Sequence, residues 1–213
     1  MRELITERDV EQARRAGGVL RVAGDYVLTP GAQDRMLKLG VRIDASRPGA
    51  EIARSREKLS VALAADHGGF DLKEDLAKHL HALGYLVLDL GTSSREAVDY
   101  PDFAHAAARA VADGTADRAI VIDGAGIGSS IVANKVPRVR AAKCDSMADV
   151  ENSRRHNDAN VLTLAGRLER SLAREMSRAW LEAPFEGGRH QRRVDKIRDV
   201  ERTYLAQETR HGH

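Results

Sequence analysis

Cysteine is almost absent from this sequence. Cys144 is the only one, so no disulfide can form within the chain, and a lone thiol fits a reducing, cytoplasmic location. Aromatic residues make up only 4% of the chain, and no apolar run approaches the about 20 residues that a membrane-spanning helix needs. The N-terminus carries acidic residues and no apolar segment, so we expect no secretory signal.

Neither sign of charge dominates. The formal net charge is +2 although 31% of the residues are charged, and this balance does not point to nucleic acid. The one basic cluster, from Arg189 to Arg198, is interrupted by Asp195 and is typical of a solvated helix face. With 213 residues, 42% of them hydrophobic, the composition predicts a soluble globular protein with one good core.

The chain divides into two parts. Residues 1–58 form a predicted N-terminal extension, with a helix over 7–16, a strand over 19–22 and a second helix that opens at Thr29-Pro30. Proline, glycine and mixed charge near its end indicate a linker. No internal repeat is visible in the sequence.

Residues 59–213 alternate strands and helices. Strands are expected at residues 60–65, 85–90, 118–123, 140–144 and 160–165, and helices at 70–83, 103–112, 131–135, 146–156, 168–181 and 189–206. Several strands are apolar without alternation, which indicates a sheet covered on both faces. We therefore predict an α/β fold: a three-layer, Rossmann-like α/β/α domain with a five-stranded parallel sheet.

Reactive side chains follow these strands. Asp123 ends an apolar strand and opens a glycine loop through Gly128, where backbone N–H groups and a helix N-terminus form an anion site. Asp66 and His67 follow the first strand. Because ligands of open α/β sheets bind at the carboxyl ends of the strands, we expect these groups, with the Arg155–Asp158 segment, on one rim.

Each of these features also has an ordinary interpretation. Asp66 could be a helix N-cap, and Tyr100 before a proline an extended turn residue. The glycine loop lacks the dinucleotide-binding spacing and the lysine of a phosphate-binding loop, which disfavours a nucleotide-binding oxidoreductase. No metal-ligand spacing is present, so we expect neither a metal nor a cofactor.

Five segments nevertheless match one family in order and spacing: Asp66–Phe70, Asp99–Pro101, Gly124–Lys135, Arg155–Val161 and Gly187–Arg193. Over about residues 59–205 the chain resembles type B ribose-5-phosphate isomerase and the related galactose-6-phosphate isomerase subunits. The resemblance implies that an aldose phosphate is converted to a ketose phosphate without metal or redox cofactor. Ribose 5-phosphate and ribulose 5-phosphate, or a closely related sugar phosphate, would be the pair, as in the pentose phosphate pathway.

The resemblance also implies residue roles. His156 would open the sugar ring with help from Asp66, and Asn157 would hold the enediolate together with the N–H groups of Gly124, Gly126 and Gly128. The phosphate would be bound by Arg189 and Arg193, with His67 and Arg167, and the further substrate contacts are Tyr100 and His190. Family sites lie between two subunits, which implies a homodimer or a dimer of dimers.

The chain departs from the family at the base. The best-known members carry a cysteine where this chain has Asp123, and another branch carries a glutamate at the position of Ser129. Either Asp123 is the base, in which case burial or a nearby charge should raise its pKa, or the substitution marks a changed substrate or a lost activity. If the activity is lost, the protein would be a non-catalytic sugar-phosphate binding protein.

The extension over residues 1–58 lies outside this resemblance. Its Leu-Thr-Pro helix start after a Gly-Gly turn is similar to N-terminal extensions of bacterial microcompartment enzymes. This implies an assembly partner and a location within a microcompartment. The alternative is an ordered cap that widens the oligomer interface.

Overall fold

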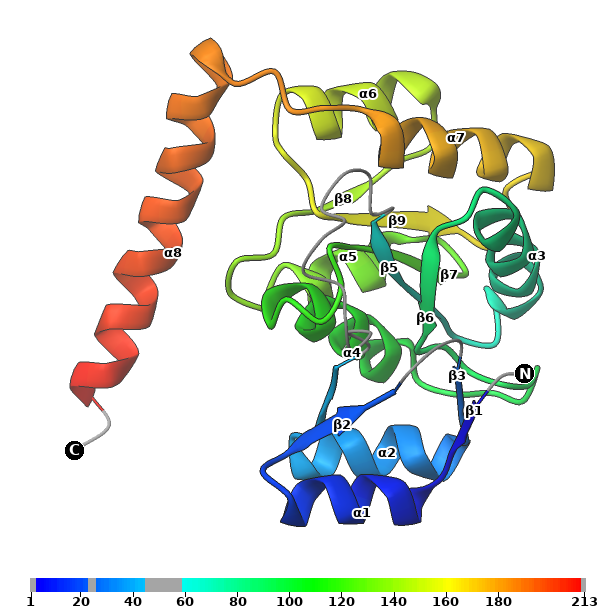
Figure 1. Ribbon diagram of the computed structural model, residues 1–213. Coiled ribbons are helices and arrows are strands. Elements are labelled where there is room, and N and C mark those ends of the chain that lie inside the picture. Colours follow the sequence, from blue (N-terminus) through cyan, green and yellow to red (C-terminus); the bar gives the residue numbers. More distant parts are fainter. Residues whose placement is uncertain (1–2, 23–25, 45–58, 212–213) are drawn as a thin grey trace, which may run out of the picture.

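The computed structural model describes residues 3–22, 26–44 and 59–211, and the expected linker lies outside them. A five-stranded parallel sheet with the order β6-β5-β7-β9-β8 forms the centre (Figure 1). Its strands are β5 (Ser60–Ala65), β6 (Leu86–Asp89), β7 (Arg118–Asp123), β8 (Ala141–Lys143) and β9 (Val161–Ala165). All five lie within two residues of their predicted positions, and the parallel sheet is confirmed.

Helices cover both faces of the sheet. One face carries α3 (Phe70–Ala82), α6 (Met147–Arg155) and α7 (Arg170–Glu182), and the other carries α4 (Tyr100–Ala112) and α5 (Ile127–Ala133). Val61 and Leu63 pack against the first set of helices, and Ala62 and Ala64 against the second. This two-residue alternation, with apolar residues on both sides, is why the middle of β5 and of β7 is apolar at successive positions. The three-layer architecture is confirmed.

Two helices begin earlier than predicted. Helix α4 starts at Tyr100, because Pro101 fits the first turn of a helix instead of preceding it. Helix α5 starts at Ile127, directly after Gly126, whose φ of 75° ends the loop. Both changes bring helix N-termini closer to the ends of the strands.

The C-terminal helix stands away from the body. A 3-10 turn, η2 (Gly188–His190), leads into α8 (Gln191–His211), which projects from the domain in Figure 1. Val194 near its start is buried, whereas four apolar side chains further along are exposed: Ile197, Val200, Tyr204 and Leu205. Within the described residues, no helix is long and apolar enough to cross a membrane.

The N-terminal residues form two strand–helix–strand units. The first is β1 (Glu3–Ile5), α1 (Glu7–Arg15) and β2 (Val19–Arg21), and the second is β3 (Tyr26–Leu28), α2 (Pro30–Leu39) and β4 (Arg42–Asp44). Strand β1 pairs with β3 and β2 with β4, both parallel and both joining residues 23 positions apart. Thr6 and Thr29 are the N-cap residues of the two helices. The two units form a structural repeat, and because few of their residues are identical the sequence shows no repeat.

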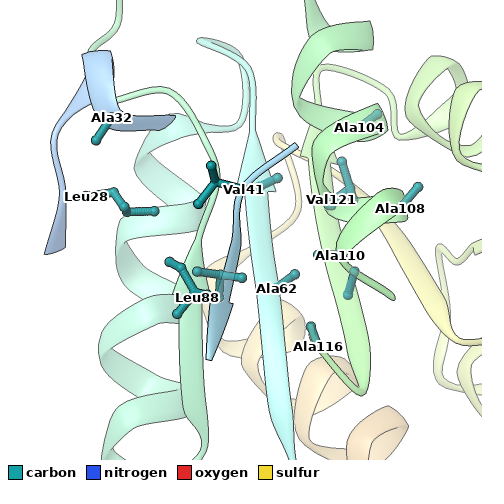
Figure 2. Close-up of a cluster of buried hydrophobic side chains, with 14 of the residues drawn as sticks. Leu28, Ala32, Val41, Ala62, Leu88, Ala104, Ala108, Ala110, Ala116 and Val121 are labelled. Atoms are coloured by element: carbon teal, nitrogen blue, oxygen red, sulfur yellow. The ribbon is translucent and has the colours of Figure 1, made fainter. Parts of the chain in front are cut away.

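This repeated module packs on the sheet. Leu28, Ala32 and Val41 belong to the same buried cluster as Ala62 of β5 and Leu88 of β6 (Figure 2). The side-chain amide of Gln33 donates a hydrogen bond to the carbonyl oxygen of Asp89 at 3.3 Å. The module and the sheet therefore share one core.

We expect Val41→Asp to lower the free energy of unfolding by about 3 kcal/mol, because a carboxylate at this 6% exposed position would be buried without a partner. Leu37→Asp is the matched control, since Leu37 is 44% exposed, and should cost far less. Urea unfolding of both variants measures the difference. Equal effects would mean that the module does not pack on the sheet in solution.

Candidate active site

The glycine loop after β7 is organised around Asp123. Its side chain is only 5% exposed, and both carboxylate oxygens accept hydrogen bonds from the loop. Oδ1 accepts the N–H groups of Ala125, at 2.8 Å, and Gly126, and Oδ2 accepts the N–H group of Ser129 at 2.8 Å. The carboxylate thus binds loop donors of the kind that would otherwise hold a substrate anion.

These bonds determine the acidity of Asp123. Burial opposes its ionisation, but the hydrogen bonds from Ser129, Ala125 and Gly126 outweigh burial and hold its pKa below the ordinary value. The expectation of a raised pKa is wrong, because the sequence does not reveal that the loop folds back onto the carboxylate. Gly126 is also not free to hold an enediolate, since its N–H group is bonded to Asp123.

Close packing holds the loop in place. A Cβ on Gly126 would lie 2.9 Å from the backbone of Leu164, and one on Gly128 would lie 2.6 Å from the ring of Tyr100. Tyr100 therefore covers the loop at Gly128 and, at 38% exposed, still reaches solvent. The guanidinium of Arg167 donates to the carbonyl oxygen of Gly124 at 3.1 Å. Tyr100 and Arg167 thus both lie at the glycine loop, and Arg167 lies apart from Arg189 and Arg193, with which the resemblance had grouped it.

Asp66 lies beside Asp123. Strands β5 and β7 pair Ala65 with Ile122, and the two aspartates are the next residues of each strand. Oδ1 of Asp66, which is 7% exposed, accepts the N–H group of Gly69 at 3.0 Å; the N-cap residue of α3 is Gly69, not Asp66. His67 accepts the N–H group of Val98 through Nδ1 at 3.2 Å. We call the residues at these strand ends (Asp66, His67, Tyr100, Asp123, the glycine loop and Arg167) the carboxylate group.

A second group surrounds two histidines. His156, the C-cap residue of α6, stacks on His190 of η2, with ring centroids 4.1 Å apart and planes at 4°. Arg189 donates through Nε to His190 Nε2 at 3.2 Å, and Arg193 Nη1 lies 3.5 Å from His190 Nδ1. Burial, with the neighbouring His156 and the two arginines, lowers the pKa of His190.

Glu186 completes the second group. Its Oε2 lies 3.7 Å from His156 Nε2 and 3.9 Å from His190 Nε2, and the donor atoms of the three side chains lie within 4.8 Å of one another. Such a trio could hold a metal ion, and the sequence did not suggest it because the spacing follows no known motif. Arg155, 3.3 Å from Glu186, and Arg189 compete with a cation there. The surroundings favour an anion.

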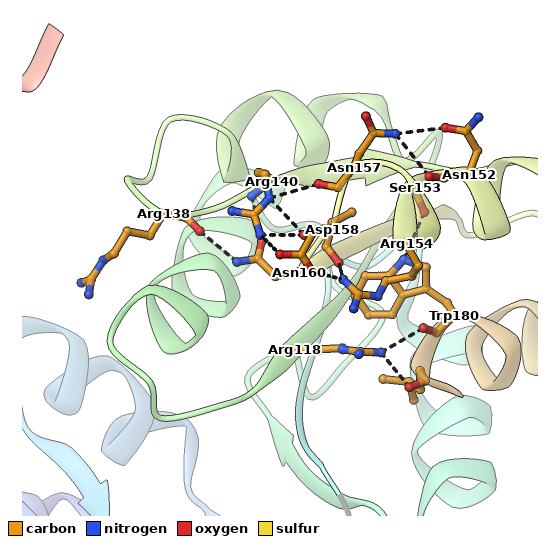
Figure 3. Close-up of polar contacts among 12 residues, drawn as sticks. Arg118, Arg138, Arg140, Asn152, Ser153, Arg154, Asn157, Asp158, Asn160 and Trp180 are labelled. Carbon is orange, nitrogen blue, oxygen red and sulfur yellow. Dashed lines mark hydrogen bonds and ion pairs between the residues drawn. The ribbon is translucent and has the colours of Figure 1, made fainter. Parts of the chain in front are cut away.

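The loop after His156 is held by an ion-pair network (Figure 3). Asp158, with a left-handed φ of 47°, pairs with Arg140 at 2.7 Å and with Arg154 at 2.9 Å. Arg140 also bonds the carbonyl oxygen of Asn157 at 3.2 Å, and the Asn157 side-chain amide donates to Asn152. Sequence reasoning assigned no role to Arg140 or Asp158, because nothing in the sequence indicates that they meet. We call His156, Asn157, Glu186, Arg189, His190 and Arg193 the histidine group.

The two groups lie at opposite edges of the sheet. Asp66 and Asp123 follow strands, whereas His156 and Asn157 lie between α6 and the start of β9. In a parallel sheet these positions are separated by the length of a strand, about 15 Å here. No hydrogen bond or ion pair between the described residues joins the groups. The expectation that all of these residues share one rim is wrong within a single chain.

Comparison with known proteins defines first a class, the sugar-phosphate isomerases. The chain belongs to the ribose/galactose isomerase family, whose model matches residues 61–197. The match contains every residue of the carboxylate and histidine groups and begins after the N-terminal module. The family expected from the five segments is confirmed.

Relatives agree with this assignment. Ribose-5-phosphate isomerase B of Escherichia coli is 45% identical, over 66% of this chain and 95% of the relative. D-erythrulose-4-phosphate isomerase of Pectobacterium atrosepticum is 40% identical, over 65% of this chain and 93% of the relative. The structure of Clostridium thermocellum ribose-5-phosphate isomerase B, 48% identical, has a TM-score of 0.67 over 68% of this chain and 99% of that protein.

The lowered pKa of Asp123 predicts a pH-dependent stability. Its contribution should be fully present above the ordinary pKa of an aspartate and lost as the pH falls through the lower folded-state value. Asp123→Asn should therefore cost about 1–2 kcal/mol at neutral pH, and the cost should shrink below about pH 4. Urea unfolding of both proteins across this range tests it. A cost that does not change with pH would contradict the ionised role of the side chain.

Proposed function

We propose that this protein is an aldose–ketose isomerase that interconverts ribose 5-phosphate and ribulose 5-phosphate, or a closely related sugar phosphate. The observation that carries the proposal is the pair of groups described above. One offers carboxylates beside backbone donors, and the other offers histidines beside arginines. The names of the relatives support the substrate class, and two of them differ in sugar length.

The reaction needs a base, a group that stabilises negative charge and an anchor for the phosphate. Ring opening moves a proton, which we assign to His156. A carboxylate then removes the proton on C2, and the enediolate oxygen is held by N–H groups, each typically contributing about 3 kcal/mol. In the described residues, the N–H groups of Gly124 and Gly128 donate to no other group. We therefore assign the enediolate to Gly124 and Gly128, with Asn157.

We assign phosphate binding to the arginines of the histidine group. Arg189 and Arg193 flank His190, and their planar guanidinium groups suit a phosphate monoester. His67 and Arg167 lie in the carboxylate group and contribute from the other side. The reaction moves protons within one substrate and needs no external electron acceptor, so we propose that acid–base groups suffice, without a metal.

A complete site requires two copies of the chain. Because the two groups lie at opposite edges of one sheet, the carboxylate group of one copy must meet the histidine group of another. The exposed apolar residues of α8 suit such an association, which would bury Ile197 and Val200. We propose a homodimer with two shared sites, or a dimer of such dimers.

The N-terminal module stands outside this chemistry. We propose that residues 1–58 serve assembly, either as a docking segment for a microcompartment or as a cap on the sheet. The core shared by Val41 and Leu88 supports the cap.

A second candidate function is favoured by one observation. Asp123 occupies the N–H groups of Ala125, Gly126 and Ser129 with its own charge, and its lowered pKa makes it a weak base. A protein that binds the sugar phosphate without turning it over would show the same arrangement.

Solvent exchange separates the two functions. In D₂O the isomerase should place deuterium on C2 of recovered ribose 5-phosphate, because the enediolate is reprotonated from a base that exchanges with solvent. NMR of the recovered sugar measures it. Binding of ribose 5-phosphate by calorimetry, with no deuterium at C2, would favour the non-catalytic protein. Asp123→Asn, measured in parallel, tests the hypothesis that Asp123 is the base: unchanged exchange would remove it.

Mixed subunits test the shared site. Asp66→Asn damages the carboxylate group and His156→Ala the histidine group, so each variant alone should be nearly inactive. Dimers formed after mixing and reassociation should contain hybrids with one intact site, which restores about a quarter of the native activity. Asp66→Asn mixed with itself is the control. A mixture as inactive as its parents would mean that each chain builds its own site.

A further inference from the structure

The two neighbouring carboxylates at the ends of β5 and β7 are not equivalent. We propose that Asp66 removes the carbon-bound proton of the substrate, whereas Asp123 is a positioning residue that holds the glycine loop. This assignment rests on the proposed isomerase function and replaces one base candidate with another. It concerns which of two adjacent groups takes the proton.

Asp123 is poorly placed to accept a proton. Its two oxygens accept three N–H groups, whereas the similarly buried Asp66 accepts one through its side chain. Protonation would place an O–H group among N–H donors and would break at least one of these bonds. A carboxylate held in this way is stabilised as an anion and loses basicity. The same bonds tie Asp123 to Ala125 and Gly126 in the loop and to Ser129 in the first turn of α5. This arrangement suits a residue that holds the shape of the loop.

Asp66 is held far less tightly. The only hydrogen bond of its side chain among the described residues is the one that Oδ1 accepts from Gly69. Its other oxygen, Oδ2, is therefore left for a substrate. The backbone of β5, buried on both faces, fixes the position of the residue at the strand end. The carboxylate is rigidly placed and chemically available.

Asp66 also faces the donors assigned to the enediolate. A carbon atom placed as a Cβ on Gly68 would lie 3.3 Å from Asp66 Oδ1 and 3.4 Å from the backbone nitrogen of Gly124. Both Oδ1 and the Gly124 nitrogen therefore lie close to Gly68, and the carboxylate and the N–H group are near neighbours. A substrate bound beside them would have a carboxylate for the proton of one carbon and an N–H group for the oxygen of the next.

The step is balanced without a further reactant. In the aldose, the C2–H bond breaks, and its proton goes to the Asp66 carboxylate. The electron pair forms the C1=C2 double bond, and O1 becomes the oxyanion held by Gly124. Transfer of the O2 proton to O1 and return of the carbon-bound proton to C1 give the ketose. Asp66 ends as a carboxylate again.

Ribulose 5-phosphate separates this role from ring opening. Its O5 carries the phosphate, so the ketose cannot close a five-membered ring, and exchange of its C1 hydrogen with D₂O needs no ring-opening group. We expect Asp66→Asn to slow C1 exchange at least 100-fold. The asparagine oxygen can still accept the N–H group of Gly69, so the turn is kept. Asp71→Asn removes an exposed carboxylate of α3, paired with Arg95 at 2.7 Å, and should leave exchange unchanged.

Chemical rescue distinguishes a base from a structural group. Asp66→Ala should be as slow as Asp66→Asn, and added formate should restore part of its C1 exchange by supplying a carboxylate in the space left. Native-like C1 exchange in Asp66→Asn, or no rescue by formate, would overturn the proposal. Exchange lost in Asp123→Asn but kept in Asp66→Asn would assign the base to Asp123. Absence of exchange in the native protein would instead refute the isomerase function itself.

Discussion

Parallel pairing of β5, β7 and β9 is the constraint on which the rest of the site depends. It places Asp66 and Asp123 side by side at one edge of the sheet, and it places the segment before β9 at the other edge. Burial of both sheet faces fixes the register, since a slip by one residue would exchange the two cores. One chain therefore holds the carboxylate group and the histidine group at opposite ends of its strands, which is the reason for proposing a site shared between two copies.

The carboxylate of Asp123 shows how a local fold can change the chemistry of a residue. Asp123 stands where the resemblance places the base of the family. The loop that it opens, however, folds back so that the N–H groups of the loop donate to its carboxylate. The hydrogen bonds that order the loop are the same ones that lower the basicity of the side chain. The neighbouring side chain of Asp66 accepts one such bond. This difference between two adjacent carboxylates is what supports the proposal that Asp66 takes the proton and Asp123 holds the loop.

The N-terminal module packs on the same sheet and shares its core. It repeats one strand–helix–strand unit and uses the second copy to cover β5 and β6 through Leu28, Ala32 and Val41. The matched relatives are covered almost completely by the remainder of the chain. The extra segment thus shares the same core, and among the described residues no hydrogen bond or ion pair joins it to Asp66 or Asp123.

The sequence by itself determined the fold class, the strands within two residues and the family, because apolar periodicity and motif spacing are local properties of the chain. It also predicted that Asp66, Tyr100 and Asp123 lie near one another, and the structure places Asp66 beside Asp123 and Tyr100 against Gly128 of the glycine loop. Tertiary structure alone decided the pKa of Asp123, the stacking of His156 on His190 and the Asp158 ion pairs, since each depends on groups brought together by folding. Tertiary structure also placed the carboxylate group and the histidine group at opposite ends of the strands. Whether a residue lies at the carboxyl or the amino end of the sheet depends on whether it follows or precedes a strand, and the order of the motifs does not show this.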